Sequence, residues 1–334
     1  MSFSKTGLDN TAIARLLEGE AVSAEEGVEG KGLRVRTLED GLVVRVGSVE
    51  GARLLISLSS DARTRIRRID FTGGLGLEEV TRCLERPGWG ELVALAVDGN
   101  AVQARQASLA PGPDNIVWFF MDGDDAFFRI LEGLSGLTRL RLCENRLGVR
   151  SARRLGCLVS LEWLEVRGNQ LGDEGVTALG SLRRLRRLDV SNNGMGAQGA
   201  ESIASLVNLR RLDISRNQVG LRGMRGLCRT LALEDLRASR CGFGPAAIAS
   251  IAQVSSLKRL DLSGNPIGMR GVGSLVRAGG WQHLWLGSCG LGDEEAMRLG
   301  ALEGLERLDL RGNRLSEATL ACLVDSLDGC SLSF

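Results

Sequence analysis

The sequence predicts an α/β solenoid, a horseshoe with a concave parallel sheet and short helices on its convex side. From Leu137 on, the pattern L-x-x-L-x-L-x-x-N-x-L returns every 24 residues, and it continues without insertion to the copy that begins at Leu305. Each copy is followed by a glycine-containing segment whose apolar residues have helical spacing. Because one such unit cannot enclose a core alone, the units must stack and share one.

The first half of each unit predicts a short strand. Side chains alternate along a strand, so the leucines at the fourth and sixth positions point inward, and the third and fifth positions face outward. The ninth position is where the chain leaves the sheet, and a stacked asparagine amide there can satisfy backbone groups of adjacent turns. Asparagine occupies it at positions 145, 169, 193, 217, 265 and 313, and Cys241 and Cys289 replace it in two units.

Quoted as they stand, the units LEWLEVRGNQLGDEGVTALGS and LKRLDLSGNPIGMRGVGSLVR resemble the leucine-rich-repeat family. They are most similar to its ribonuclease-inhibitor-like branch and to the bacterial branch with 24-residue repeats. The resemblance implies a leucine-rich-repeat solenoid of about eleven repeats, counted from Ile66.

The pattern also predicts the organisation of the chain. Residues 137–334 hold the regular repeats and the C-terminal end, and residues 66–136 hold degenerate repeats, one of them at 116–121, with an irregular loop around Pro111 and Pro113. Residues 1–65 depart from the repeat and predict an N-terminal cap, with a helix ending near Leu17 and a hairpin around Asp40 and Gly41. A separate functional module in residues 1–65 is the alternative.

Composition argues against several classes of function. The chain has 42 Lys and Arg against 41 Asp and Glu, a formal net charge of +1, so the sequence favours neither nucleic acid nor a membrane as its partner. A single histidine, His283, excludes multi-histidine metal sites, and no phosphate-binding glycine motif is present. We therefore expect no enzymatic activity, metal, cofactor or small-molecule substrate, and a cytoplasmic protein unless it is secreted as an effector.

The outward positions predict where a partner binds. The plain units carry Arg at the third position and Asp at the fifth, which favours neutralisation between neighbouring strands over specific contacts. Units that depart from this pair are more informative, because Trp and Arg often dominate binding energy. The predicted partner-binding residues are Trp118, Phe120, Arg141, Trp163, Arg237, His283 and Trp285. The alternative for Trp118 and Phe120 is packing beneath the irregular loop.

These observations favour a non-catalytic scaffold for protein–protein recognition, with a protein partner on the concave face. Related solenoids also regulate other enzymes, so an inhibitor or a GTPase activator is the first alternative. An effector delivered into another cell as an adaptor is the second.

Overall fold

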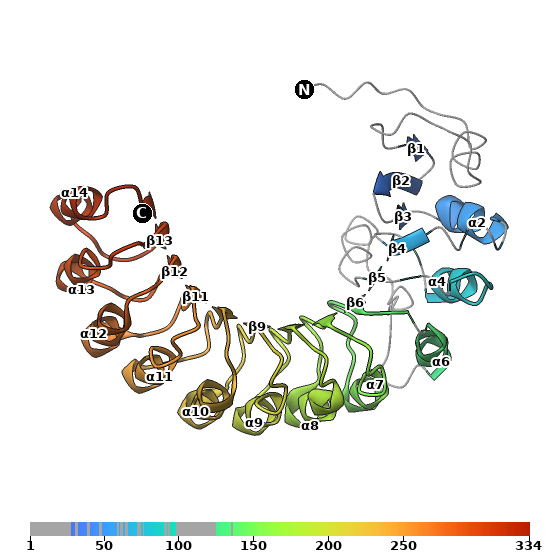
Figure 1. Ribbon diagram of the computed structural model, residues 1–334, viewed down its shortest axis with the longest axis horizontal. Helices are drawn as coiled ribbons and strands as arrows, with labels where there is room; N and C mark the ends of the chain where they lie inside the picture. The colour runs from blue at the N-terminus through green and yellow to red at the C-terminus, as the bar shows by residue number, and fades with distance from the viewer. Residues whose placement is uncertain are drawn as a thin grey trace, which may run out of the picture. The chain divides into compact units, whose positions relative to one another are not determined.

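The computed structural model describes residues 125–134 and 136–334, and before them the segments 28–30, 33–38, 41–46, 49–58, 66–71, 77–89 and 94–97 together with residues 60, 63, 75 and 92. The chain divides into two compact units, Met1–Asn169 and Gln170–Phe334. Each unit is built from alternating strands and helices (Figure 1).

The first unit carries seven described strands that pair in chain order. They are β1 (Val28–Gly30), β2 (Leu33–Leu38), β3 (Gly41–Val46), β4 (Ile66–Phe71), β5 (Ala94–Val97), β6 (Arg139–Arg141) and β7 (Trp163–Glu165). Its helices are α2 (Val49–Ser57), α4 (Leu77–Leu84), α6 (Asp125–Gly133) and α7 (Val149–Leu155). The strands from β3 on pair in parallel, as the alternation with helices requires.

The antiparallel pairing of β2 with β3 confirms the predicted hairpin. Strand β3 then pairs in parallel with β4, and α2 connects the two strands. The strand–helix alternation therefore begins at Gly41, inside the segment 1–65 that the sequence predicts as a cap. The predicted helix ending near Leu17 lies outside the described residues.

The prediction of a repeat at residues 116–121, between β5 and β6, is wrong. Strand β5 pairs directly with β6, with Leu95 opposite Leu140, so no strand of residues 116–121 lies between these two. A strand in that position would separate Leu95 from Leu140 by two strand spacings. Residues 98–124 lie outside the described part of the chain.

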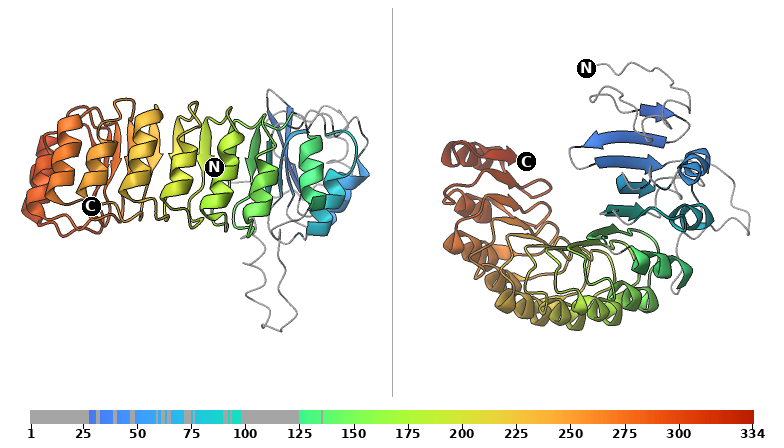
Figure 2. Two further views of the ribbon diagram at one scale, coloured as in Figure 1. Left: turned by 90° about the horizontal axis from the view of Figure 1, so that it is seen from below. Right: turned by 45° about the vertical axis from the view of Figure 1, so that its right-hand side comes forward.

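The second unit repeats a strand and a helix with little variation. Its strands are β8 (Arg187–Asp189), β9 (Arg211–Asp213), β10 (Asp235–Arg237), β11 (Arg259–Asp261), β12 (His283–Trp285), β13 (Arg307–Asp309) and β14 (Ser331–Ser333). Its helices are α8 (Gly172–Ala178), α9 (Ala197–Ile203), α10 (Gly220–Thr230), α11 (Pro245–Ile251), α12 (Gly268–Ala278), α13 (Asp293–Leu299) and α14 (Glu317–Ser326). Figure 2 shows these strands side by side, with the helices along their outer side.

Strand pairing in the second unit keeps one register throughout. Each strand pairs in parallel with the next, and residues 24 apart lie opposite each other, as Leu236 does with Leu212 and Leu260. The inward leucines of β8–β13 are at most 2% exposed. Behind them lies a second buried row from the helices, which includes Ile203, Leu227 and Leu275. This common core confirms the predicted burial pattern.

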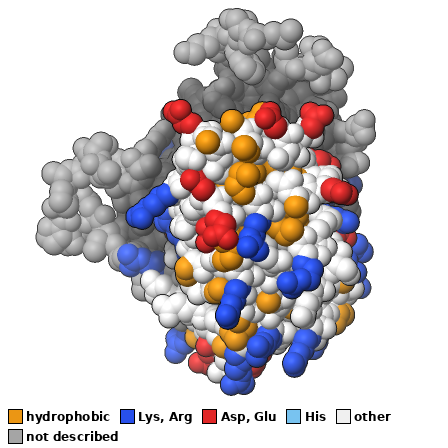
Figure 3. Space-filling model, turned by 90° about the vertical axis from the view of Figure 1, so that its left-hand side faces the viewer, with side chains coloured by type: hydrophobic (Ala, Val, Ile, Leu, Met, Phe, Trp, Pro, Cys, Tyr) orange, Lys and Arg blue, Asp and Glu red, His pale blue; other side chains and the backbone are white. Residues whose placement is uncertain are grey.

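The last strand, β14, extends the register beyond the predicted repeats, since Leu332 lies opposite Leu308. Figure 3 shows the end of the second unit that β14 and α14 form, where apolar side chains lie among acidic and basic ones. Val324 and Phe334 are 55% and 43% exposed. No helix among the described residues is both long and apolar enough to cross a lipid bilayer.

In four of the described repeats, an asparagine joins the repeat to the one before it. Asn265 accepts hydrogen bonds from the backbone N–H groups of Cys241 and Phe243, both at 3.0 Å. It also donates to the carbonyls of Ala238 and Leu262 at 2.8 and 2.7 Å. The same four-bond pattern recurs at positions 169, 217 and 313. One side chain thus satisfies buried polar groups of two turns, as the sequence predicted.

The cysteines at this position reproduce only half of the pattern. Cys241 Sγ donates to the carbonyls of Ile214 and Ser239 at 3.3 and 3.5 Å, and Cys289 donates in the same way to Leu262 and Gly287. A thiol has no amide oxygen, and its sulfur is a weak acceptor. Cysteine therefore keeps the donor role and weakens the acceptor role.

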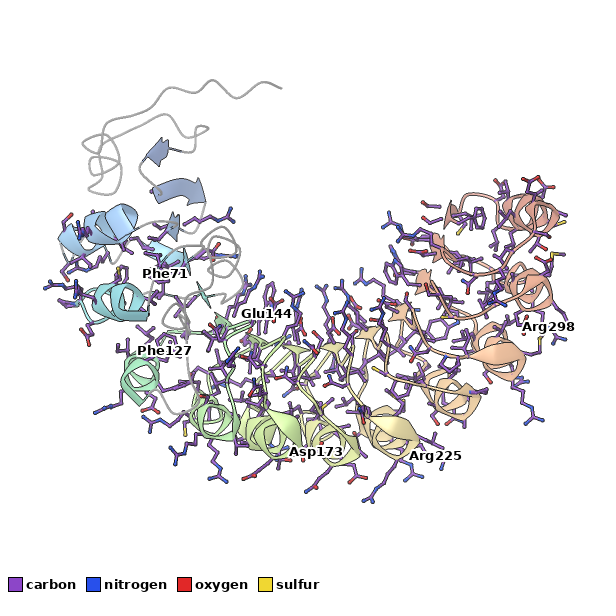
Figure 4. The ribbon with its side chains drawn as sticks, turned by 180° about the vertical axis from the view of Figure 1, so that it is seen from behind. Phe71, Phe127, Glu144, Asp173, Arg225 and Arg298 are labelled. Atoms are coloured by element: carbon purple, nitrogen blue, oxygen red, sulfur yellow. The ribbon has the colours of Figure 1, made fainter. Side chains whose placement is uncertain are left out.

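A second connection between repeats is an aspartate in one helix that caps the next helix. Asp173 Oδ1 accepts the N–H groups of Gly196 and Gly199 at 2.7 and 2.8 Å, and Gly196 is the N-cap of α9. Figure 4 shows Asp173 among the helices. Asp293 does the same for α14 by accepting the N–H of Ser316 at 2.8 Å. Each carboxylate thus serves a helix in the following repeat.

Close helix packing explains a recurrent glycine. Gly223 lies within α10, and a methyl group there would come within 2.9 Å of Ala200 Cβ and 3.1 Å of Ala197 Cα. The glycines in the helical halves therefore allow neighbouring helices to approach, in addition to any role in the preceding turn.

We expect Asn265→Ala to lower the free energy of unfolding by about 2–4 kcal/mol, because two buried N–H groups lose their acceptor. Asn265→Cys should lower the free energy of unfolding by less, since cysteine occupies this position in two other repeats, at Cys241 and Cys289. Urea denaturation of both variants measures the difference. Unfolding midpoints equal to that of the unmodified protein would contradict a stabilising role for the asparagines.

We expect Asp173→Ala to lower the free energy of unfolding by about 1 kcal/mol, because α9 loses its capping acceptor. Asp173→Asn keeps an oxygen in the same place and should lose less. Thermal unfolding followed by circular dichroism compares the two variants. An identical loss in both would show that the accepting oxygen does not stabilise α9.

Candidate functional site

The aspartate that is frequent at the fifth position of the repeat accepts a hydrogen bond from the backbone. The Oδ1 atoms of Asp213 and Asp261 each accept the N–H of the residue two positions later, Ser215 or Ser263, at 2.9 Å. Asp189 and Asp309 make the equivalent bond. These carboxylates hold the chain where it leaves each strand. The predicted neutralisation between neighbouring strands is wrong for β8 and β9, because Arg187 lies opposite Arg211 and Asp189 lies opposite Asp213.

In the first unit, Trp163 is held by neighbouring side chains. Its indole N–H donates to Glu165 Oε1 at 2.9 Å, and the guanidinium of Arg139 lies 5.4 Å from the ring centroid. Arg141 lies in register with Glu165 and forms an ion pair with it at 3.7 Å. The structure therefore brings Arg141 and Trp163 together, through Glu165, on the outward side of β6 and β7.

In the second unit, His283 and Trp285 form a stacked pair on β12. Their ring centroids are 5.6 Å apart, with planes inclined by 25°. His283 Nε2 lies 3.4 Å from Glu306 Oε2, which is an ion pair when the imidazole is protonated. Both aromatic side chains are half-buried, so the pair presents a flat aromatic surface on the sheet.

The indole N–H of Trp285 makes no hydrogen bond within the described residues, whereas those of the other described tryptophans do. Trp89 donates to the carbonyl of Cys83, Trp281 to that of Leu275, and Trp163 to Glu165. Trp281 is 2% exposed, which confirms that it belongs to the core. Trp285 donates to no side chain or carbonyl of the described residues. It therefore presents both an apolar ring and an unused donor at the surface.

The charged surroundings of Trp285 follow from the strand register. Asp261 and Asp309 lie opposite it on β11 and β13. Asp309 is engaged by Arg311, whose Nε lies 3.0 Å from both carboxylate oxygens, and this guanidinium lowers the pKa of Asp309. Arg237 lies in register with Asp261, two strand spacings or about 10 Å from Trp285.

Burial raises the pKa of Asp213 to about 6, and the nearby Asp189 carboxylate contributes in the same direction. Hydrogen bonds from Ser215 and the charge of Arg237 oppose this rise. Asp213 therefore changes its charge at about pH 6, close to neutral pH.

The predicted site residues fall into three sets. Arg141 with Trp163, and His283 with Trp285, are pairs that the structure brings together, and Arg237 stands near the second pair. Trp118 and Phe120 lie outside the described residues. Sequence analysis missed Glu306 and the unused donor of Trp285, since neither depends on the repeat pattern. Within the described segments, no cluster of His, Cys, Asp or Glu is suited to a metal ion.

Replacement of Asp213 by Asn should change how stability depends on pH. Between about pH 4, near the pKa of an unfolded aspartate, and about pH 6, the folded protein retains a proton that the unfolded chain releases. The contribution of Asp213 to stability is thus present below this window and lost as the pH rises through it. Asp213→Asn should gain about 2–3 kcal/mol over the unmodified protein between about pH 4 and about pH 7. Urea denaturation at both pH values tests this, and a constant difference would contradict it.

Comparisons with known proteins agree with this fold. A family model described as leucine-rich repeat matches residues 158–180, 182–204, 205–228 and 255–276. No curated protein matches the sequence. The solved structure of a complex of TLR13 with the RNA ssRNA13 matches 83% of this chain with a TM-score of 0.52 at 21% identity, and the chain spans 36% of TLR13. An internalin from Listeria monocytogenes matches 97% of this chain and 94% of its own length, with a TM-score of 0.44 at 18% identity. The matched repeats, together with the register of the strands, show that this chain contains leucine-rich repeats.

Proposed function

We propose that this protein is a non-catalytic recognition scaffold that binds a protein partner on the outward side of its strands, with Trp285 and His283 as the central contact. The unused indole donor of Trp285 carries the proposal. A tryptophan that served only to fill the core would be buried with its N–H bonded, as Trp281 and Trp89 are.

Energetics favour this contact over the regular positions. Tryptophan contributes large contact area with little loss of conformational freedom, and its N–H adds a directional hydrogen bond. The adjacent Asp261 has one oxygen on the backbone N–H of Ser263, and its second oxygen lies on the same side of the sheet as Trp285. A partner's backbone carbonyl on the indole N–H and an apolar side chain on the ring would complement this surface.

Arg141 and Trp163 are proposed as a second contact, with Trp118 and Phe120 predicted beside them. The bonds of Trp163 to Glu165 and its packing with Arg139 fix its orientation before a partner binds. They also occupy its donor, so its contribution should be smaller than that of Trp285.

A protein partner is favoured over nucleic acid by the charge on the sheet. Outward arginines alternate with aspartates, and the chain as a whole is nearly neutral. The solved TLR13 structure holds an RNA, so an RNA oligonucleotide belongs among the controls. A regulator of another enzyme and an adaptor are narrower forms of the same recognition role.

We expect Trp285→Ala to lose the partner that the unmodified protein retains in affinity capture from native lysate. The reason is the loss of the contact surface and donor, which should weaken binding by about 2 kcal/mol or more. His283→Ala should weaken partner binding less, because we propose that the imidazole lies at the edge of the contact and Trp285 at its centre.

The matched control is Arg225→Gln, an exposed change on the outer side of α10 (Figure 4). Circular dichroism and unfolding midpoints establish that each variant is folded. Equal recovery of the partner by Trp285→Ala and by the unmodified protein would rule out this surface as the binding site.

A further inference from the structure

The eighth position of the repeat, directly before the buried asparagine or cysteine, has a left-handed backbone conformation. Glycine occupies it at positions 168, 264 and 312, with φ of 69°, 73° and 73°. Arg216 and Arg240 occupy the same position in two adjacent repeats, with φ of 56° and 52°. Left-handed backbone is unfavourable for residues other than glycine. Glu144, Asn192 and Ser288 hold the same conformation in other repeats, and at each such position the side chain costs backbone free energy that glycine would not.

Gly264 shows where the Arg240 side chain lies. A methyl group on Gly264 would come within 2.7 Å of Arg240 Cγ and 3.6 Å of its Nε. The Arg240 side chain therefore crosses over the next repeat, and the glycine there leaves space for it. Arg216 stands one repeat earlier, since its N–H donates to the Ser239 carbonyl beside Arg240 at 2.8 Å.

A third arginine, Arg237, lies at the same end of the strands. It does so because β10 begins with aspartate and ends with arginine, whereas β8, β9, β11 and β13 begin with arginine and end with aspartate. Asp235 occupies the third position and Arg237 the fifth, where β8, β9, β11 and β13 carry aspartate. Arg237 is exposed, whereas the fifth-position side chains of the other strands from β8 to β13 are buried or half-buried. Two separate departures from the repeat thus meet at the ends of β9 and β10.

These three residues, Arg216, Arg237 and Arg240, form an arginine cluster with few internal partners. Among the described residues, Arg216 and Arg240 donate no side-chain hydrogen bond and form no ion pair. Arg237 lies in register between Asp213 and Asp261, and both carboxylates already accept a backbone N–H. The other acidic groups nearby are paired elsewhere, Asp235 with Arg259 at 3.5 Å and Glu234 with Arg210 at 3.9 Å.

We infer that the arginine cluster binds an acidic segment of the partner protein, whose Asp or Glu carboxylates pair with the guanidinium groups of Arg216 and Arg240. The inference deepens the proposed function and rests on it. Guanidinium groups hold carboxylates through paired hydrogen bonds, and exposed arginines without partners are available to do so. Arg237 adds positive charge at the side of the cluster that faces Trp285.

The small extent of the cluster favours an acidic peptide over nucleic acid. Its backbone positions span two adjacent repeats, about 5 Å apart, whereas nucleic acid is usually held by phosphate contacts spread along a basic track. The next repeats carry Gly264, Ser288 and Gly312 at the eighth position, so the basic character ends at Arg240.

The test uses the full chain and a fluorescein-labelled oligo-glutamate peptide, followed by fluorescence anisotropy. The double variant Arg216→Gly and Arg240→Gly removes the charges and gives each backbone the residue that three other repeats carry there, so it should fold at least as stably as the unmodified chain. We expect its dissociation constant for the peptide to rise about tenfold, and binding by the unmodified chain to weaken with added salt.

Two controls isolate the cause. Ser288→Gly makes the same backbone change without removing charge, and Arg225→Gln removes one arginine from the helical side; both should bind the peptide as the unmodified chain does. A labelled oligo-glutamine peptide should not bind. Absence of oligo-glutamate binding, equal affinity in the double variant, or tighter binding of a single-stranded RNA that also depends on Arg216 and Arg240 would overturn the inference.

The two proposals fail in different ways. If the double variant keeps its affinity for oligo-glutamate while Trp285→Ala still loses the captured partner, the acidic-segment inference fails and the recognition proposal stands. If Trp285→Ala retains the partner, the proposed contact surface fails whatever the peptide does.

Discussion

The rest of the structure depends on one set of hydrogen bonds. Where the chain turns out of the sheet, backbone N–H groups of one repeat donate to a side chain of the next repeat. The strands are only three residues long in the second unit, and backbone hydrogen bonds between repeats continue as far as the eighth position, as from Arg216 to Ser239. The N–H groups of the ninth and eleventh positions bond to a side chain instead, as those of Cys241 and Phe243 do. Asn217, Asn265 and Asn313 each satisfy two N–H groups of the preceding repeat. The fixed spacing of 24 residues follows from these hydrogen bonds, because an inserted residue would move the amide out of reach.

The same arrangement separates positions that hold the fold from positions that are free to vary. Aspartates at the fifth position accept a backbone N–H, and Asp173 and Asp293 cap helices of the following repeat. Where β10 and β12 carry Arg237 and Trp285 in place of the fifth-position aspartate, the side chain makes no such bond to the backbone of the described residues. The aromatic pair on β12 and the arginine cluster at the ends of β9 and β10 both occur where a repeat departs from the common residues, and for this reason they are the candidates for recognition.

The sequence predicted most of this fold, because each buried position repeats and its neighbours are set by the period. The leucine rows, the asparagine bonds, the core position of Trp281 and the hairpin of β2 and β3 were all accessible in that way. The predicted position of a repeat at 116–121 was wrong, because the pairing of β5 directly with β6 cannot be read from a few apolar residues that match the pattern. The parallel pairing of β3 with β4, the last strand β14, the bond between Trp163 and Glu165, and the position of Arg240 over Gly264 depend on neighbours in space, which a one-dimensional pattern does not contain.

Because two cysteines occupy the asparagine position, the hydrogen bonds between repeats are weaker at two places in the second unit than at the others. Burial raises the pKa of Cys241 to about 11, so its thiol stays protonated and unreactive while the repeats are stacked. Each cysteine also gives the preceding turn a weaker acceptor than an amide oxygen. In a linear array, where neighbours contact only neighbours, a junction that holds cysteine is bonded less strongly than one that holds asparagine. Each thiol is buried while its junction is closed, so it becomes chemically reactive only when that junction opens.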